Sequence, residues 1–387
     1  MAEPDHYPRP ARLFVGGDVF ANLPDGGSAF RHLSPLLQTA DLVVANCEGV
    51  YSDRPSPAPS HKHLMVASPE RGSMLGAVPF HVLGCANNHM MDGGYEGLSD
   101  TLETLRSQGI ATVGAGMDLD EAVRPVLLER QGVTFAFLAF CSVFPVGYEA
   151  RRSRPGIAPL RVRTFYADPD PDFWEPGIDP LVVTMPFPAD GERFRKAIAD
   201  ARELADVVVV LPHWGYSGRL EKLHDYEIEL ARDAVDHGAD VVLCCHHHSL
   251  RAVEFHRGRP IFYGMGSLVH HLRSSYQLSP EEIARGRDKV HQSDDAFPFF
   301  PLHPDARMTG VATFDVGADG SRQAGFVPAQ IQPDGSTEPL RPGDPRTTAV
   351  VEYLARITCE SGFDTVFKLS ERDSWAWLTA ADSRETQ

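Results

Sequence analysis

Residues 238–249 read GADVVLCCHHHS, and in this segment a short apolar run leads directly into consecutive histidines. The valines favour a buried strand over about residues 239–244, because β-branched side chains fit a pleated surface. Neutral imidazoles that follow a buried strand need partners. Since side chains alternate along a strand, we expect His246 and His248 to face one way and His247 the other.

Other segments also place polar side chains where a predicted strand ends. In open α/β sheets, ligands bind outside the carboxyl ends of the strands, so these strand ends and the histidine segment can converge on one crevice. The segments are GGD at 16–18, NCE at 46–48, ANNH at 86–89 and PHWG at 212–215.

Short apolar runs alternate with helical patterns along the chain, which is typical of an α/β sheet with helices on its faces. The clearest helices cover about residues 193–205 and 224–237, and Gly238 follows the second in a C-cap position. Strands are predicted at about 12–16, 41–45, 80–85, 111–113, 122–129, 133–141, 206–211, 239–244 and 260–263.

Two segments interrupt this alternation. Residues 142–180 are rich in Pro and Arg and predict a long excursion over the surface near the sheet edge. Residues 272–306 contain a short charged helix followed by the aromatic cluster FPFFP at 297–301. Such a segment forms either a lid or an insertion that packs its aromatic side chains on the body.

The carboxyl-terminal part has a different pattern. A pair of strands around residues 318–320 reads as a hairpin, and a helix is predicted near 346–358. We expect a catalytic domain over residues 1–330, including both interrupting segments, and an extension over 331–387 that packs on it.

The composition describes an acidic globular chain. Its 387 residues are 42% hydrophobic, which is enough for a large core, and its six cysteines are scattered without the spacing of a disulfide framework. A net charge of -17 disfavours nucleic acid and anionic membranes as partners. The amino terminus lacks a signal-peptide pattern, and no segment approaches the roughly 18 apolar residues of a membrane span. We therefore expect a cytoplasmic protein with a small-molecule substrate.

The polar groups at the strand ends are candidate metal ligands. Carboxylates and imidazoles suit Zn, Mn or Fe, and one carboxylate can bridge two ions about 3.5–4 Å apart. Any one of these residues alone is weak evidence, because an Asp after a strand is commonly a helix cap and a lone His is commonly hydrogen-bonded at a rim. The candidates are Asp18, Glu48, Asn88, His213, His246 and His248.

Together these segments resemble a known family. GGDV, NCEG, CANNHMMDGG, PHWG and the run from residue 238 to 269 are similar, in order and spacing, to motifs of the capsule-synthesis CapA branch of the calcineurin-like metallophosphoesterases, over about residues 12–270. The resemblance implies an α/β (α+β sandwich) metallophosphoesterase fold with a dinuclear metal site. It implies that Asp18, Glu48 and His248 hold one ion, and that Glu48, Asn88, His213 and His246 hold the other.

The resemblance also implies two catalytic residues. His89 is similar to a family histidine that contacts substrate or delivers a proton, and Asp92 is placed to orient it. The alternative for Asp92 is a structural role as the cap of the following helix.

The chain departs from the family pattern in three places. The usual Asp-x-His reads Asp18-Val19-Phe20, so that histidine is missing. Gly-His-His-Pro-His reads CCHHH at 244–248, where Cys245 is expected to be a packing residue rather than a nucleophile. Ser-Leu-Gly-Asn-Phe reads GMGSL at 264–268, followed by His270 and His271, which could line the pocket but are expected at the surface.

Two chemistries are open to these ligands. Hydrolysis of a phosphoester is usual for the superfamily, whereas a di-iron pair with vacant positions could bind dioxygen and hydroxylate a C–H bond. The chain is also similar to a di-iron monooxygenase offshoot from platensimycin and platencin biosynthesis. We expect such a monooxygenase, with a metal-dependent phosphoesterase or a CapA-like role in polyglutamate capsule synthesis as alternatives. A non-enzymatic assembly factor is a further alternative.

The expected cofactors follow from that choice. Two iron ions with dioxygen as cosubstrate are expected, and manganese or zinc is the alternative. The substrate would be a lipophilic small molecule such as a terpenoid or an acyl-CoA. Arg151, Arg152 and Arg154 could meet its carboxylate or coenzyme A phosphate, although arginines in a loop are commonly only solvated.

Overall fold

The fold is that of a computed structural model, which describes residues 9–23, 25–57, 63–170, 172–173, 175–216, 222–272, 292 and 294–382. Within these residues the chain is a mixed α/β sandwich in which two β-sheets share one buried apolar core. The expected fold class is therefore confirmed. None of the described helices is long and apolar enough to span a membrane.

The larger sheet contains both parallel and antiparallel strands. β1, β2, β5 and β6 run parallel to their neighbours, and β1 pairs with antiparallel β18 over its first half and with parallel β17 over its last residues. In order the strands are β21 (Thr365–Arg372), β22 (Trp375–Asp382), β19 (Arg322–Ile331), β18 (Met308–Val316), β1 (Ala11–Phe20), β2 (Leu42–Cys47), β5 (Val82–Gly84) and β6 (Ala111–Val113), with β17 (Ser267–His270) on β1 and β20 (Thr337–Pro339) on β19.

The second sheet is parallel at its centre and antiparallel at both edges. Its central strands are nearly continuous valine, leucine and phenylalanine, as expected of strands buried on both faces. In order they are β15 (Val253–His256), β16 (Arg259–Phe262), β14 (Val241–Leu243), β13 (Val207–His213), β9 (Val133–Cys141) and β8 (Val126–Arg130).

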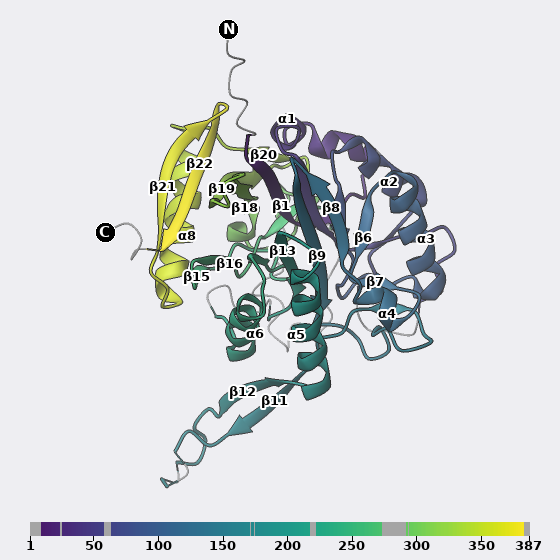
Figure 1. The fold of residues 1–387 in the computed structure, drawn as a ribbon, viewed down its shortest axis with the longest axis vertical. Coiled ribbons are helices and arrows are strands. Elements are labelled where there is room, and N and C mark those ends of the chain that lie inside the picture. Colours follow the sequence, from purple (N-terminus) through teal and green to yellow (C-terminus); the bar gives the residue numbers. More distant parts are fainter. Residues whose placement is uncertain are drawn as a thin grey trace.

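Helices cover the outer faces of the sheets (Figure 1). α5 and α6 pack on the second sheet, where Phe194, Ile198 and Leu230 are buried, and α3 lies beside β6. The longer helices are α3 (Gly94–Ser107), α5 (Pro188–Arg202), α6 (Asp225–Asp236) and α8 (Pro345–Glu360); the shorter are α1 (Ser34–Leu37), α2 (Pro69–Ser73), α4 (Leu119–Ala122), η1 (Gly26–Phe30), η2 (Met74–Ala77) and η4 (Pro304–Arg307).

Most predicted elements are present, and the main differences lie at their ends. Both expected helices are confirmed as α5 and α6, and Gly238 follows α6 with a φ of 116°. The strand predicted over 122–129 is wrong at its start, because α4 ends at Ala122 and β8 begins at Val126. β1 continues to Phe20 and β13 to His213, so Asp18 and His213 lie within strands rather than after them.

The prediction that the segment 142–180 is a surface excursion is only partly correct, because Tyr148, Ala150, Ile157, Ala158 and Leu160 are buried. The segment also contains more structure than expected. β11 (Val162–Ala167) and β12 (Leu181–Pro186) form an antiparallel hairpin that projects from the body (Figure 1). Phe165, Tyr166 and Leu181 are exposed on this hairpin. The short pairs β3 (Val50–Tyr51) with β4 (Val66–Ala67), and β7 (Ala115–Gly116) with β10 (Gly156–Ile157), complete the strands.

Much of the segment 272–306 lies outside the described residues, so the lid prediction is not tested there. In its described part, Phe300 is buried against Leu302 and Ile331, and the guanidinium of Arg307 lies over the Phe297 ring. These aromatic side chains pack on the body.

The carboxyl-terminal elements form as predicted and extend the larger sheet. β18 and β19 are the expected hairpin, α8 is the expected helix, and β22 pairs with β19 so that β21 becomes the edge of the sheet. The division into domains at residue 330 stays a prediction.

Candidate metal centre

The position of Asp18 depends on a bulge in β1. Between Val15 and Asp18, β1 advances three residues while β2 advances two, and the extra residue falls in the Gly16-Gly17 pair. A Cβ atom on Gly17 would collide with the carbonyl oxygen of Gly266, so only glycine permits this approach. The buried carboxylate of Asp18 accepts a 2.7 Å hydrogen bond from Asn46 Nδ2.

Glu48 follows β2 and is completely buried. Neither of its carboxylate oxygens has a hydrogen-bond partner. Oε1 lies 3.4 Å from His213 Nε2, whereas Oε2 lies 3.4 Å from His270 Nε2 and 3.7 Å from His248 Nδ1. Burial raises the pKa of Glu48, but His248 and His213 outweigh burial and hold this pKa well below its ordinary value, so the side chain is a carboxylate.

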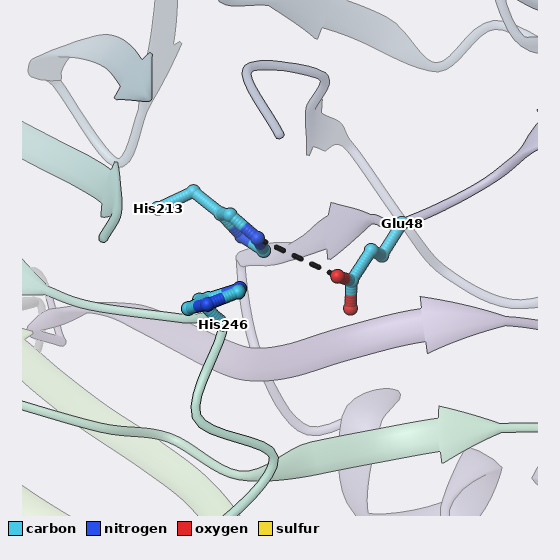
Figure 2. A group of neighbouring side chains, drawn as sticks. All are labelled: Glu48, His213 and His246. Atoms are coloured by element: carbon cyan, nitrogen blue, oxygen red, sulfur yellow. Dashed lines mark ion pairs between the residues drawn. The ribbon is translucent and has the colours of Figure 1, made fainter. Parts of the chain in front are cut away.

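Two groups of ligand atoms share this carboxylate. Glu48, His213 and His246 form the first, which Figure 2 shows, and Glu48, His248 and His270 form the second. Within each group, all the candidate ligand atoms lie within 4.8 Å of one another. His246 Nδ1 and both ring nitrogens of His270 are buried without hydrogen-bond partners. Buried polar atoms without partners are costly, which fits positions that receive cations.

Asn88 and His213 are in direct contact, because Asn88 Oδ1 lies 2.7 Å from His213 Nε2. On the other side of the ring, Asn46 Nδ2 lies 3.3 Å from His213 Nδ1. Asn87 Nδ2 donates to Asn46 Oδ1 at 3.2 Å and to the carbonyl of Cys47 at 2.7 Å. Sequence reasoning did not assign a role to Asn46 or Asn87, which fix the orientation of Asp18 and His213.

The consecutive histidines do alternate in direction, but not for the reason predicted. β14 ends at Leu243, and His246 and His248 have φ angles of 103° and 55°, so a turn and not a strand sets their directions. His248 Nδ1 lies 3.2 Å from Asp18 Oδ2 and 3.1 Å from Ser267 Oγ. His247 Nε2 points the other way and lies 3.1 Å from Glu227 Oε1 of α6.

His89 is held by a buried carboxylate. Its Nδ1 lies 2.6 Å from Asp92 Oδ2. Asp92 also accepts hydrogen bonds from the backbone N–H of Met65 at 2.8 Å and from the Tyr148 hydroxyl at 3.0 Å. The alternative role of Asp92 as a helix cap is wrong, since the N-cap of α3 is Gly93 and no side chain caps it.

The prediction that His270 and His271 lie at the surface is wrong, because both are buried. His271 Nδ1 accepts from the N–H of Asn22 at 3.0 Å and its Nε2 donates to the carbonyl of Gly335 at 3.0 Å, whereas His270 faces Glu48. The sequence signal was available, because His270 directly follows the apolar pair Leu268-Val269 and ends a short strand, as His213 ends β13.

Cys245 is a packing residue, as predicted. Its side chain is buried, and burial together with the charge of Asp18 raises the pKa of its thiol well above the ordinary value. A protonated buried thiol is a poor nucleophile.

Access to the centre is uneven. Asp18, Glu48, His213, His246 and His270 are buried. Asn88, His89 and His248 are partly exposed, so the centre is open to solvent on their side. Two of the arginines considered for a coenzyme A phosphate are already paired, because Arg151 and Arg154 both contact Glu149.

The sequence matches a described family. The profile of the bacterial capsule synthesis protein family PGA_cap aligns with residues 12–271. The chain belongs to this family. The predicted resemblance to CapA-like proteins is thereby confirmed, and the PGA_cap region contains every candidate ligand described above.

Curated relatives of this PGA_cap member are named for polymer synthesis. The PGA biosynthesis protein CapA of Bacillus subtilis is 32% identical over 245 residues, which is 62% of this chain and 56% of that protein. A polyglutamine synthesis accessory protein of Mycobacterium tuberculosis is 32% identical over 248 residues, which is 61% of this chain and 58% of that protein. The chain thus spans just over half the length of these relatives.

The solved structures that align with the PGA_cap member include one of low sequence identity. It is GAP50, the anchor in the inner membrane complex of Plasmodium, with 11% identity over 86% of this chain and 89% of that one. The TM-score is 0.31, too low to bear on fold or function.

Proposed function

We propose that this PGA_cap member is a metal-dependent hydrolase that cleaves a phosphoester with a pair of divalent ions. The observation that carries the proposal is Glu48, whose two buried, unpartnered oxygens face different histidines: Oε1 lies beside His213, and Oε2 lies beside His270 and His248. A carboxylate shared in this way is the usual bridge of a two-metal site.

The residues present fit such ions. A buried carboxylate and buried imidazoles without hydrogen-bond partners are donors for zinc, manganese or iron. One ion would be held by Glu48, His213, His246 and Asn88, and the other by Glu48, Asp18 and His248. When bound, the ions supply Lewis acidity and lower the pKa of a water molecule that attacks the substrate.

The protein's own groups supply orientation and a proton. Because Asp92 accepts from His89 Nδ1, the proton that His89 exchanges with substrate belongs to Nε2. In the proposed reaction His89 protonates the leaving oxygen. Asn46 and Asn87 keep the Asp18 carboxylate and the His213 ring in place as charge develops.

The proposal is tested with metal-free protein reloaded with Mn²⁺ or Zn²⁺ and assayed on p-nitrophenyl phosphate and bis-p-nitrophenyl phosphate. We expect metal-dependent turnover that Glu48→Ala abolishes, together with a loss of bound metal. Glu192→Ala, an exposed residue of α5, is the matched control and should change neither. Equal activity with and without metal, or full activity of Glu48→Ala, would refute the proposal.

A second candidate is a role in the synthesis of an anionic polyglutamate polymer. The PGA_cap match and the names of the curated relatives support it. The test is expression in Bacillus subtilis that lacks its CapA. Restored polymer would favour this role; no restoration, with phosphoesterase turnover intact in vitro, would favour the hydrolase alone.

The di-iron monooxygenase predicted from the sequence is the third candidate, and its support is the donor set alone, since carboxylate and imidazole also suit iron. Elemental analysis of freshly purified protein separates the candidates. About two irons per chain would support dioxygen as cosubstrate and a lipophilic or CoA-linked substrate, with an electron donor still to be found. Zinc or manganese would support hydrolysis.

We also propose that the substrate is a small molecule and that the protein works in the cytoplasm. Both proposals rest on the net charge of -17, which disfavours nucleic acid and anionic membranes. Cell fractionation tests the location, and vesicle co-sedimentation tests the membrane.

A further inference from the structure

His270 lies on β17, which replaces β18 as the neighbour of β1 beside the candidate metal centre. β17 runs parallel to β1, with Ser267 opposite Asp18 and His270 opposite Phe20. Between these pairs β17 contains one extra residue, Leu268, which is a β-bulge. Side chains three positions apart on a regular strand face opposite sides, and the bulge corrects this offset. Ser267 and His270 therefore both face the carboxylates.

The His270 side chain is buried and has no hydrogen-bond partner at either ring nitrogen. Its Nε2 lies 3.4 Å from Glu48 Oε2, and its ring centroid lies 4.6 Å from that of His248. A buried polar atom left unpaired destabilises the fold. His271, the next residue, is also buried but uses both nitrogens in hydrogen bonds. His271 is thus satisfied at both ring nitrogens, whereas His270 is satisfied at neither.

Phe20 occupies the position where the Asp-x-His pattern would place a histidine. Its ring packs over Gly49, the residue after Glu48, and lies 6.4 Å from the His270 ring. A ligand at position 20 and a ligand at position 270 would therefore approach the same ion from adjacent strands.

We infer that His270 is a metal ligand that replaces, from the neighbouring strand, the histidine absent at Phe20, and that it completes the ion position of Asp18, Glu48 and His248. The inference rests on the proposed dinuclear centre. It assigns this chain a ligand set in which β17, and not β1, supplies the second imidazole of that ion, beside His248.

The test is a histidine exchange measured by metal content. Wild type, His270→Phe, His270→Asn, the double variant Phe20→His with His270→Phe, and the control His32→Phe are stripped and titrated with Zn²⁺ alone. Bound zinc is counted by elemental analysis, and circular dichroism confirms the fold. Phe matches the size of its neighbour Phe20, and Asn keeps a polar group, so the two single variants disturb packing differently. His32 is exposed.

We expect wild type and His32→Phe to bind two equivalents of Zn²⁺. Both single variants at position 270 should bind the second equivalent at least about tenfold more weakly, and the double variant should regain it. Two equivalents with unchanged affinity in both single variants would overturn the inference while leaving the dinuclear centre intact. Loss without recovery in the double variant would overturn the exchange between strands. Fewer than two equivalents in wild type would instead refute the proposed centre.

Discussion

In the proposed reaction, metal binding and proton transfer belong to different single residues. Glu48 has two unpartnered oxygens for ions, whereas Asp92 uses its oxygens for His89, Tyr148 and the backbone of Met65. The two buried carboxylates therefore have different tasks. This difference makes the role of His89 testable without disturbing the ligands.

His89→Ala should slow hydrolysis according to the leaving group. If His89 protonates the leaving oxygen, kcat on phenyl phosphate should fall by about 10²–10⁴-fold. The loss on p-nitrophenyl phosphate should be much smaller, because p-nitrophenolate leaves without a proton. Steady-state kinetics on both substrates measures the difference, and His256→Ala, which pairs with Asp236 away from the centre, is the control. Equal losses on both substrates would contradict this role.

At the scale of elements, the start of α6 contacts two segments that contain candidate ligands, PHWG at 212–215 and HHH at 246–248. Glu227 Oε2 accepts from the N–H of His224, which closes the first turn of α6, while Oε1 contacts His247. The Tyr226 hydroxyl accepts from the N–H of Gly215 at 2.6 Å. His246 and His248 have positive φ angles, which cost about 1–3 kcal/mol each in a non-glycine residue. His247 lies between these two residues, and its contact with Glu227 of α6 helps to hold the turn in this conformation.

Glu227→Gln and Glu227→Ala should therefore weaken metal binding although Glu227 is no ligand. A residue that hydrogen-bonds a metal ligand typically changes metal affinity by about 10–100-fold. Because Glu227 contacts His247, which lies between the ligands His246 and His248, we expect a loss near the lower end of this range for the Ala variant and a smaller one for Gln. Isothermal titration with Zn²⁺ measures it. Glu229→Ala, exposed on the same helix, is the matched control. An unchanged affinity in the Ala variant would show that α6 does not position the histidines.

A second element-scale prediction concerns the base of the projecting hairpin. Asp190, in the first turn of α5, is buried and accepts hydrogen bonds from Arg161 and Arg193. Burial raises the pKa of Asp190, but these arginines outweigh burial and hold the pKa below its ordinary value. A lowered folded-state pKa contributes stability above the unfolded pKa of about 4, and this stability is lost as the pH falls through the folded-state value.

Asp190→Asn should consequently destabilise the protein at neutral pH, and the difference from wild type should shrink below about pH 4. Urea unfolding of both proteins at pH 7 and at pH values down to about 3 measures it. A difference that grew on acidification would contradict the assignment.

At the scale of the whole molecule, Asp240 connects parts that are distant in sequence. Its carboxylate contacts Arg202 at the end of α5 at 2.7 Å, Arg259 of β16 at 3.4 Å and Arg322 of β19 at 3.1 Å, and it accepts from the N–H of Val208. β19 belongs to the larger sheet, and β14 and β16 belong to the second. This cluster therefore joins the two sheets at one end.

Asp240→Ala should destabilise the whole fold, because it leaves three arginines without their shared carboxylate. We expect a loss of about 2–4 kcal/mol in the free energy of unfolding, measured by urea titration. Asp200→Ala is the matched control, since Asp200 forms an ion pair with Lys196 on the surface and such pairs contribute little. Similar losses in both variants would contradict the connecting role of Asp240.

The strands and helices were largely predictable because their signals are local. Valine runs such as 207–210 and the helical spacing of Phe194, Ile198 and Ala201 depend only on neighbouring residues. The exact ends were less predictable. β1 continues through Asp18 because β17 replaces β18 as its neighbour there, and that pairing joins residues far apart in the chain.

The candidate site likewise has a part that was predictable from the sequence and a part that was not. The sequence by itself placed polar residues close to the ends of predicted strands, and so it supplied Asp18, Glu48, His213, His246 and His248 as candidates. Only the tertiary structure decided that His270 joins them, that Asn46 and Asn87 orient them, and that turns with positive φ direct His246 and His248. The physical reason is that a strand end fixes a position in the chain, whereas the direction of a side chain depends on bulges and on partners from distant segments.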